Sequence, residues 1–199
     1  MIVVQLRGNS GSGKTTVVRK ALAQWPFTAI RDPYLDPTLA GKRRRDPIAY
    51  CSTGELPLIV LGSYEPTCGG CDTIPTQDEI ALRIRRYLAE GYHVLFEGLL
   101  ASELRRYEVL AAELQVTGHQ YVHVFLDTPL ALCLARVVER RQTRGDTRPF
   151  NPANTTRRHE VITRARVRAE AAGLAVQRLS SEDAWPYILR LLDATTRHA

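Results

Sequence analysis

The chain has 199 residues, a length that suits one domain, and its 44% apolar and 24% charged content is typical of a water-soluble globular protein. No apolar run approaches the roughly 20 residues that span a bilayer, and the apolar start of the chain is too short for a signal peptide, so we expect a cytoplasmic protein without membrane contact. The net charge is +6, carried mostly by arginine, which favours a polyanionic partner.

Short apolar runs alternate with amphipathic segments along the chain. Strands are expected at residues 2–6, 27–31, 57–62, 92–97, 121–126 and 174–179, and helices at residues 15–24, 77–90, 102–116, 129–139, 156–172 and from 182 onward. This alternation predicts an α/β fold with a mostly parallel five-stranded sheet, helices on both faces, and a single domain over residues 1–199.

Two helix starts have clear capping signals. Thr76 and Glu79 form a capping box, in which the hydroxyl caps the helix and the carboxylate reaches back to the backbone. Thr128, followed by Pro129, is expected to cap the helix that follows the fifth strand.

The segment Gly8–Thr15 fits the pattern GxxxxGK[ST] and lies between an apolar strand and a helix, as a phosphate-binding loop does. Lys14 is expected to bridge the β- and γ-phosphates and act in catalysis, and the Thr15 hydroxyl to ligate Mg²⁺. The predicted nucleotide contacts are Gly8, Asn9, Ser10, Gly11, Ser12, Gly13, Lys14, Thr15 and Thr16. We therefore expect the protein to bind ATP with Mg²⁺ and to transfer its terminal phosphoryl group.

An acidic residue ends the predicted fourth strand, in the segment Val94–Gly98. A carboxylate at the tip of a buried strand beside a phosphate-binding loop can hold Mg²⁺. Glu97 is therefore the second predicted metal ligand.

The basic segment that follows residue 135 resembles the arginine-rich lid of small P-loop kinases, and the chain lacks the Asn-Lys-x-Asp motif of GTPases. We place this lid at about residues 140–155, where the composition is that of a loop. Arg136 and Arg144 are predicted to contact the nucleotide, and Arg140 to stabilise charge in the transition state. An AAA-type motor normally needs a longer chain.

The segment Ile30–Tyr34 resembles the Arg-Asp-x-Tyr stretch of polynucleotide 5′-hydroxyl kinases, whose aspartate is the general base. The resemblance makes Asp32 the first candidate for the base, with Asp36 as a neighbouring alternative, and it makes Arg31 a substrate contact. Asp72, on a glycine-rich loop after the third strand, is a second candidate.

The whole chain resembles bacteriophage P-loop kinases, in particular the 5-hydroxymethyluracil DNA kinases. Besides the phosphate-binding loop, the resemblance is carried by residues 69–79 (GGCDTIPTQDE), 96–100 (FEGLL) and 150–154 (FNPAN). It implies an ATP-dependent kinase that phosphorylates the hydroxymethyl group of 5-hydroxymethyl-2′-deoxyuridine (5-hmdU) in phage DNA. The host-cell cytoplasm is then the expected location.

A DNA acceptor agrees with other features of the sequence. The basic cluster Arg43, Arg44 and Arg45 could neutralise DNA phosphates. Tyr34 and Tyr64 could stack on an exposed base, which has to leave the duplex to reach the γ-phosphate.

Other interpretations stay open. The chain could phosphorylate a free nucleoside, nucleotide or sugar, or act as a polynucleotide 5′-hydroxyl kinase. It could also be a nucleotide-binding switch or DNA-binding accessory protein without kinase activity. Cys68 and Cys71 could form half of a zinc site with Cys51 as a third ligand, or simply flank a glycine-rich turn.

Overall fold

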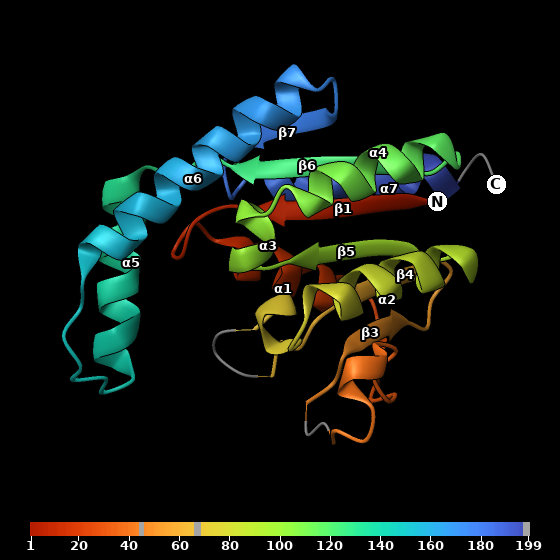
Figure 1. The fold of residues 1–199 in the computed structure, drawn as a ribbon, viewed down its shortest axis with the longest axis horizontal. Coiled ribbons are helices and arrows are strands. Elements are labelled where there is room, and N and C mark those ends of the chain that lie inside the picture. The colour runs from red at the N-terminus through yellow and green to blue at the C-terminus, as the bar shows by residue number, and fades with distance from the viewer. Residues whose placement is uncertain (44–45, 66–68, 197–199) are drawn as a thin grey trace.

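Seven strands form one sheet in the order β2-β3-β4-β5-β1-β6-β7 (Figure 1). The structure is a computed structural model and describes residues 1–43, 46–65 and 69–196. The strands are β1 (Ile2–Arg7), β2 (Phe27–Ile30), β3 (Ala49–Ser52), β4 (Leu58–Leu61), β5 (His93–Glu97), β6 (Gln120–Leu126) and β7 (Ala175–Leu179). The α-helices are α1 (Lys14–Gln24), α2 (Gln77–Ala89), α3 (Leu99–Glu103), α4 (Arg106–Val116), α5 (Leu130–Thr143), α6 (Pro152–Ala171) and α7 (Ala184–Thr196), and two 3₁₀ turns cover Pro37–Leu39 and Cys71–Thr73.

The prediction of a five-stranded sheet is wrong: all six segments expected as strands pair in the sheet, and β3 is a seventh, although the sheet is mostly parallel as expected. Strands β4, β5, β1, β6 and β7 are parallel, whereas β3 runs antiparallel to both β2 and β4. Strand β3 has only four residues and follows Pro47, so its sequence resembles a proline-rich loop. Strand β3 extends the sheet beyond β4, and β2 is therefore the edge strand.

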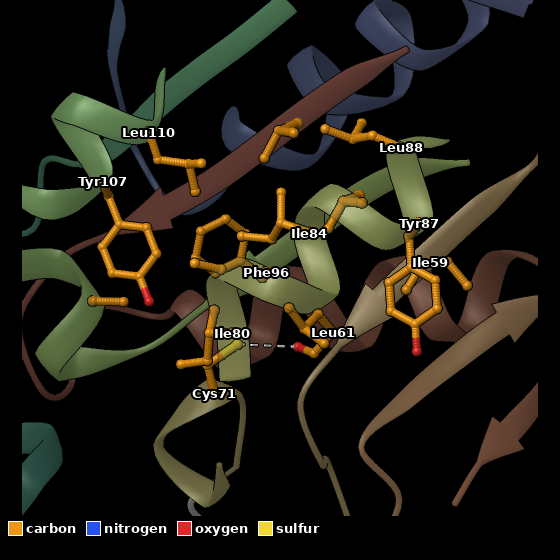
Figure 2. Packing of buried hydrophobic residues seen from close by; sticks show 14 of the residues in the cluster. Ile59, Leu61, Cys71, Ile80, Ile84, Tyr87, Leu88, Phe96, Tyr107 and Leu110 are labelled. Carbon is orange, nitrogen blue, oxygen red and sulfur yellow. Dashed lines mark hydrogen bonds between the residues drawn. The ribbon is translucent and has the colours of Figure 1, made fainter. Parts of the chain in front are cut away.

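Two hydrophobic cores lie on opposite faces of the sheet, because alternate residues of each strand point to opposite sides. On β5, for example, Val94 and Phe96 belong to the core under α2 and α4, and Leu95 belongs to the core under α1 and α7. Figure 2 shows the first core, where Phe96 packs between Ile84 of α2 and Tyr107 of α4. Among the helices that the structure describes, none is long and apolar enough to cross a membrane.

The capping box at the start of α2 forms only in part. The Thr76 hydroxyl accepts the N–H of Glu79 at 3.1 Å, as predicted. The fully buried Glu79 carboxylate instead accepts the N–H groups of Leu35 and Asp36 and pairs with Arg83 at 2.7 Å. Glu79 therefore fastens the segment after β2 to α2.

The helices α5 and α6 form a hairpin at the carboxyl ends of β1, β5 and β6 (Figure 1). The predicted loop of residues 140–155 is shorter in the structure, because α5 continues to Thr143 and α6 begins at Pro152, capped by Asn151. At least five of the ten arginines between residues 136 and 168 pair with carboxylates, namely Arg141 and Arg148 with Asp146, Arg158 with Glu103, Arg166 with Glu170, and Arg168 with Glu108. The segment is thus largely helical and held by ion pairs.

Thr128 does not cap α5, whose N-cap is Pro129. Its hydroxyl instead donates to the carbonyl oxygen of Ser12 at 2.9 Å, so it braces the loop that follows β1. A residue that resembles a helix cap in the sequence here supports the phosphate-binding loop.

Candidate active site

The loop Gly8–Thr15 joins β1 to α1 and requires glycine at two positions. Gly11 and Gly13 have φ angles of +78° and +98°, in the left-handed region. A Cβ atom on Gly11 would lie 2.4 Å from the carbonyl oxygen of Cys133 in α5. The loop is therefore preshaped, and it lies at a helix N-terminus, where the backbone favours an anionic ligand.

Lys14 is buried at the base of this loop. Its ammonium group donates to the carbonyl oxygens of Gly8 at 2.8 Å and Asn9 at 2.9 Å. Burial lowers the pKa of Lys14, and the nearby charge of Glu97 acts against that shift. The loop itself thus holds the cation in place for a bound phosphate.

Glu97 ends β5 and lies against the start of α1. Its carboxylate accepts the hydroxyl hydrogen of Thr15 at 2.8 Å. Burial raises the pKa of Glu97, while Lys14 and the Thr15 hydroxyl lower it. A carboxylate and a hydroxyl side by side are oxygen ligands of the kind that Mg²⁺ prefers, so the residues present fit this ion.

The last described part of the loop after β4, at Gly70, lies against Glu97. Gly70 has a φ of +76°, and a Cβ atom there would lie 2.7 Å from Oε1 of Glu97. Two residues later, the Asp72 carboxylate accepts the N–H of Leu99 at 2.8 Å and that of Leu100 at 3.3 Å. The loop therefore brings a second carboxylate to the start of α3, next to the end of β5.

These groups line one pocket of about 830 Å³. Its walls consist of Asn9, Ser10, Gly11, Ser12, Gly13, Lys14, Thr15, Thr16, Lys20, Gly69, Asp72, Glu97, Leu99, Leu100, Arg136, Arg140, Arg158, Ser181 and Glu182. Arg136 also donates to the carbonyl oxygen of Gly11 at 3.3 Å. The structure thus brings together the predicted phosphate-binding loop, both carboxylates Glu97 and Asp72, and two of the predicted arginines.

Asp32 lies apart from this pocket. It pairs with Arg83 at 3.7 Å and Arg86 at 4.0 Å, both on α2. Strand β2, which precedes it, is the edge strand, four positions from β1 in the sheet. At about 4.8 Å per strand, the axes of β2 and β1 are roughly 19 Å apart.

The predicted substrate contacts near Asp32 are also outside the residues that line the pocket. Arg31 pairs with Glu65 at 2.9 Å. The Tyr34 side chain packs against the core beneath α2, and Tyr64 is only 7% exposed in the other core. Neither tyrosine offers an open ring face at the pocket.

The other basic residues that were predicted to contact the substrate or the nucleotide are Arg43, Arg44, Arg45 and Arg144. Arg43 is exposed and does not line the pocket, and Arg44 and Arg45 lie outside the described residues. Arg144 is exposed at the C-terminal end of α5, one turn beyond Arg140.

The cysteines give no further indication of a metal site. Cys68 lies outside the described residues, and Cys71 is buried with its thiol donating to the carbonyl oxygen of Leu61 (Figure 2). In the described part of the chain, no three or more histidine, cysteine or acidic side chains gather closely enough to hold a metal ion.

The sequence profile of the AAA domain family matches residues 3–164. The chain is also similar to two curated proteins named 5-hmdU DNA kinase. The protein from Pseudomonas phage PaMx11 is 38% identical over 196 residues, covering 96% of this chain and 97% of the relative. The protein from Pseudomonas phage M6 is 30% identical over 192 residues, covering 92% and 94%. This chain belongs to the AAA domain family and to the family of the 5-hmdU DNA kinases.

In this member of the 5-hmdU DNA kinase family, several pocket residues carry no signal in the sequence. Arg158 reaches the pocket from α6, and Ser181 and Glu182 reach it from the turn after β7. Leu99 and Leu100 belong to a segment that supports the family resemblance, but nothing in their type predicts a role in the site. Only the fold places these residues beside the phosphate-binding loop.

Proposed function

We propose that the protein is an ATP-dependent kinase that phosphorylates the hydroxymethyl group of 5-hmdU in DNA. The observation that carries the proposal is the hydrogen bond between Thr15 and Glu97 at the phosphate-binding loop that holds the buried Lys14. The chain is also similar over nearly its full length to two 5-hmdU DNA kinases. Because both relatives are phage proteins, we propose the host-cell cytoplasm as the location.

The residues of the phosphate-binding loop hold ATP in this proposal. Backbone N–H groups of Gly8–Thr15 and the Lys14 ammonium bind its phosphates, and Arg136 lies over the loop. Thr15 and Glu97 hold Mg²⁺, which neutralises charge on the β- and γ-phosphates when bound. Arg140, on the same wall of the pocket, stabilises the charge of the phosphoryl group during transfer.

We assign the general base to Asp72. Its carboxylate lines the pocket beside Glu97, whereas Asp32 is four strands from β1 and paired with α2. Asp72 accepts the proton of the hydroxymethyl group. The hydroxymethyl oxygen bonds to the terminal phosphorus of ATP as the bond from that phosphorus to the leaving ADP breaks. A target base in duplex DNA is flipped out to reach this point.

The α5–α6 hairpin acts as the lid of the pocket in this proposal. Arg136 and Arg140 extend from α5 and Arg158 from α6 into the same cavity. Closure of the hairpin brings these arginines, and Arg144 with them, nearer to the phosphates and excludes water.

The test is to incubate the protein with [γ-³²P]ATP and DNA that contains either thymidine or 5-hmdU. We expect label only in the 5-hmdU DNA, within the strand. Label in both DNAs, or in neither, would contradict the proposal. Label confined to 5′ ends would identify a polynucleotide 5′-hydroxyl kinase, and label in a free nucleoside, nucleotide or sugar would identify a small-molecule kinase.

A further inference from the structure

Two leucines contribute large apolar side chains to one surface of the active-site pocket. Among its described lining residues, only Leu99 and Leu100 have large apolar side chains. Leu100 is 43% exposed, even though it lies inside a cavity that also holds charged groups. A single exposed leucine on an outer surface needs no explanation, but one inside a reaction pocket is available to a ligand.

This apolar surface lies at one end of the pocket. Helix α3 follows β5, whereas Ser181 follows β7, and the sheet order places β1 with its phosphate-binding loop between those two strands. Leu100 is three residues from Glu97, and its N–H group binds Asp72. The leucines are therefore next to the groups proposed to hold the metal and to accept the proton.

Helix α3 is fixed at both ends, so the leucines are held in place. At its start, Asp72 accepts the N–H groups of Leu99 and Leu100. At its end, the fully buried Gln5 donates to the carbonyl oxygen of Ala101 at 3.0 Å. The fully buried Arg7 likewise donates to the carbonyl oxygen of Ser102, at 2.8 and 3.1 Å. A surface that is preorganised in this way can orient a ligand at little entropic cost.

We infer that Leu100, together with Leu99, is the surface against which the flat face of the acceptor base packs. The inference rests on the proposed function and adds to it the contact that orients the acceptor. A pyrimidine has an apolar face and a polar edge, so it can cover the leucines while its hydroxymethyl group points to Asp72. A phosphate has no apolar face, and a sugar ring carries hydroxyl groups around a puckered ring and is not flat. The leucines therefore favour a nucleobase.

The first experiment compares Leu100→Ala with Leu132→Ala, a change at a leucine of similar exposure (42%) on α5 that does not line the pocket. We expect Leu100→Ala to raise the KM for 5-hmdU DNA about fivefold, because less apolar surface is covered by the base, and to leave the Kd for a fluorescent ATP analogue unchanged. Leu100→Met, which keeps the apolar surface, should restore the KM. Leu132→Ala should match the wild type.

An unchanged KM in Leu100→Ala, or an equal rise in Leu132→Ala, would overturn the inference while leaving the kinase assignment intact. A wild-type protein that phosphorylates no 5-hmdU DNA would overturn both. The two failures are thus distinguishable in one set of assays.

A spectroscopic measurement tests the contact without turnover. Leu100→Trp places an indole on the same surface, and its fluorescence, after subtraction of the wild-type signal, should be quenched by 5-hmdU DNA in the presence of a non-hydrolysable ATP analogue. DNA with an abasic site at the target position should bind without this quenching. Equal quenching by both DNAs would show that the base does not pack on this residue.

Discussion

The Thr15 hydroxyl donates a 2.8 Å hydrogen bond to the Glu97 carboxylate and so joins the start of α1 to the end of β5. If this pair holds Mg²⁺, Glu97→Gln should lower kcat at least about 100-fold, because loss of the metal removes several kcal/mol of charge stabilisation. The Mg²⁺ concentration for half-maximal rate should rise. Glu90→Gln, which changes an exposed carboxylate at the C-cap of α2, is the control. Equal Mg²⁺ dependence in the wild type and Glu97→Gln would contradict the assignment.

Gly70 lies so close to Glu97 that a side chain there would displace the carboxylate. The added Cβ atom in Gly70→Ala would stand 2.7 Å from Oε1 of Glu97. We expect kcat to fall at least tenfold, with the melting temperature measured alongside. Gly91→Ala is the matched control, because Gly91 also has a positive φ, +86°, but no atom within 4 Å of the added Cβ. It should cost about 1–2 kcal/mol of stability and leave kcat unchanged.

Two carboxylates compete for the role of general base, and paired variants separate them. Asp72→Asn should reduce kcat by about 10²–10⁴ if Asp72 accepts the proton. Asp32→Asn should cost about 1 kcal/mol or less, the usual value of a partly exposed ion pair, with kcat within twofold of the wild type. The reverse pattern in single-turnover assays would return the role to Asp32.

Arg140 and Arg144 lie one turn apart on the α5–α6 hairpin, but of the two only Arg140 lines the pocket. Arg140→Ala should lower kcat about tenfold or more by removing positive charge near the transferred phosphoryl group. Arg144 starts outside the pocket and comes nearer only on the proposed closure, so Arg144→Ala should lower kcat less than Arg140→Ala does. A comparable loss in both variants would indicate a larger closure that brings Arg144 to the nucleotide.

Two buried histidines predict acid sensitivity. Burial lowers the pKa of His93 to about 4, helped by the N-terminal charge, and burial lowers the pKa of His123 to about 3, helped by Arg7. Because the unfolded chain takes up these protons near pH 6.5, stability is present above that pH and is lost as the pH falls toward 4, by about 2 kcal/mol per histidine at pH 5.

Urea unfolding at pH 7.5 and pH 5 measures this loss. His93 accepts the N–H of Ile2 through Nδ1, and the side-chain oxygen of His93→Asn can accept the same bond. Between the two pH values, the free energy of unfolding of this variant should fall by about 2 kcal/mol less than that of the wild type. His159→Asn, a change on α6, should lose as much as the wild type. A wild-type-like loss in His93→Asn would refute the explanation.

The residues proposed to hold ATP can be located from the sequence alone, because a phosphate-binding loop is defined by contiguous residues with local geometry. Lys14 and Thr15 follow from the motif, and Glu97 follows from an apolar run that ends in an acid. The acceptor half depends on where each strand joins the sheet. Asp32 follows a strand that comes next to α1 in sequence, but the unforeseen β3 separates that strand from β4. Sequence order alone does not reveal this separation.

Other positions that the sequence does not reveal have a similar origin. Thr128 has the sequence pattern of a helix cap, and only the packing of α5 against the loop shows that it bonds to Ser12. Leu100 has no polar chemistry to mark it, so its place in the pocket comes from the position of α3 after β5. Arg158 pairs with Glu103, 55 residues away, and Arg168 pairs with Glu108, 60 residues away. The sequence does not predict these pairs, because only the fold brings the residues together.

The ion pairs of the hairpin arginines affect how strongly salt should weaken the proposed binding to DNA. Each phosphate that a free cation neutralises releases bound counter-ions and adds about 0.9 to the slope of log affinity against log salt concentration. An arginine that is already paired with a neighbouring carboxylate adds less to this slope. At least half of the arginines between residues 136 and 168 are paired in this way. If the protein binds DNA as proposed, the count of arginines therefore overstates how strongly salt would weaken that binding.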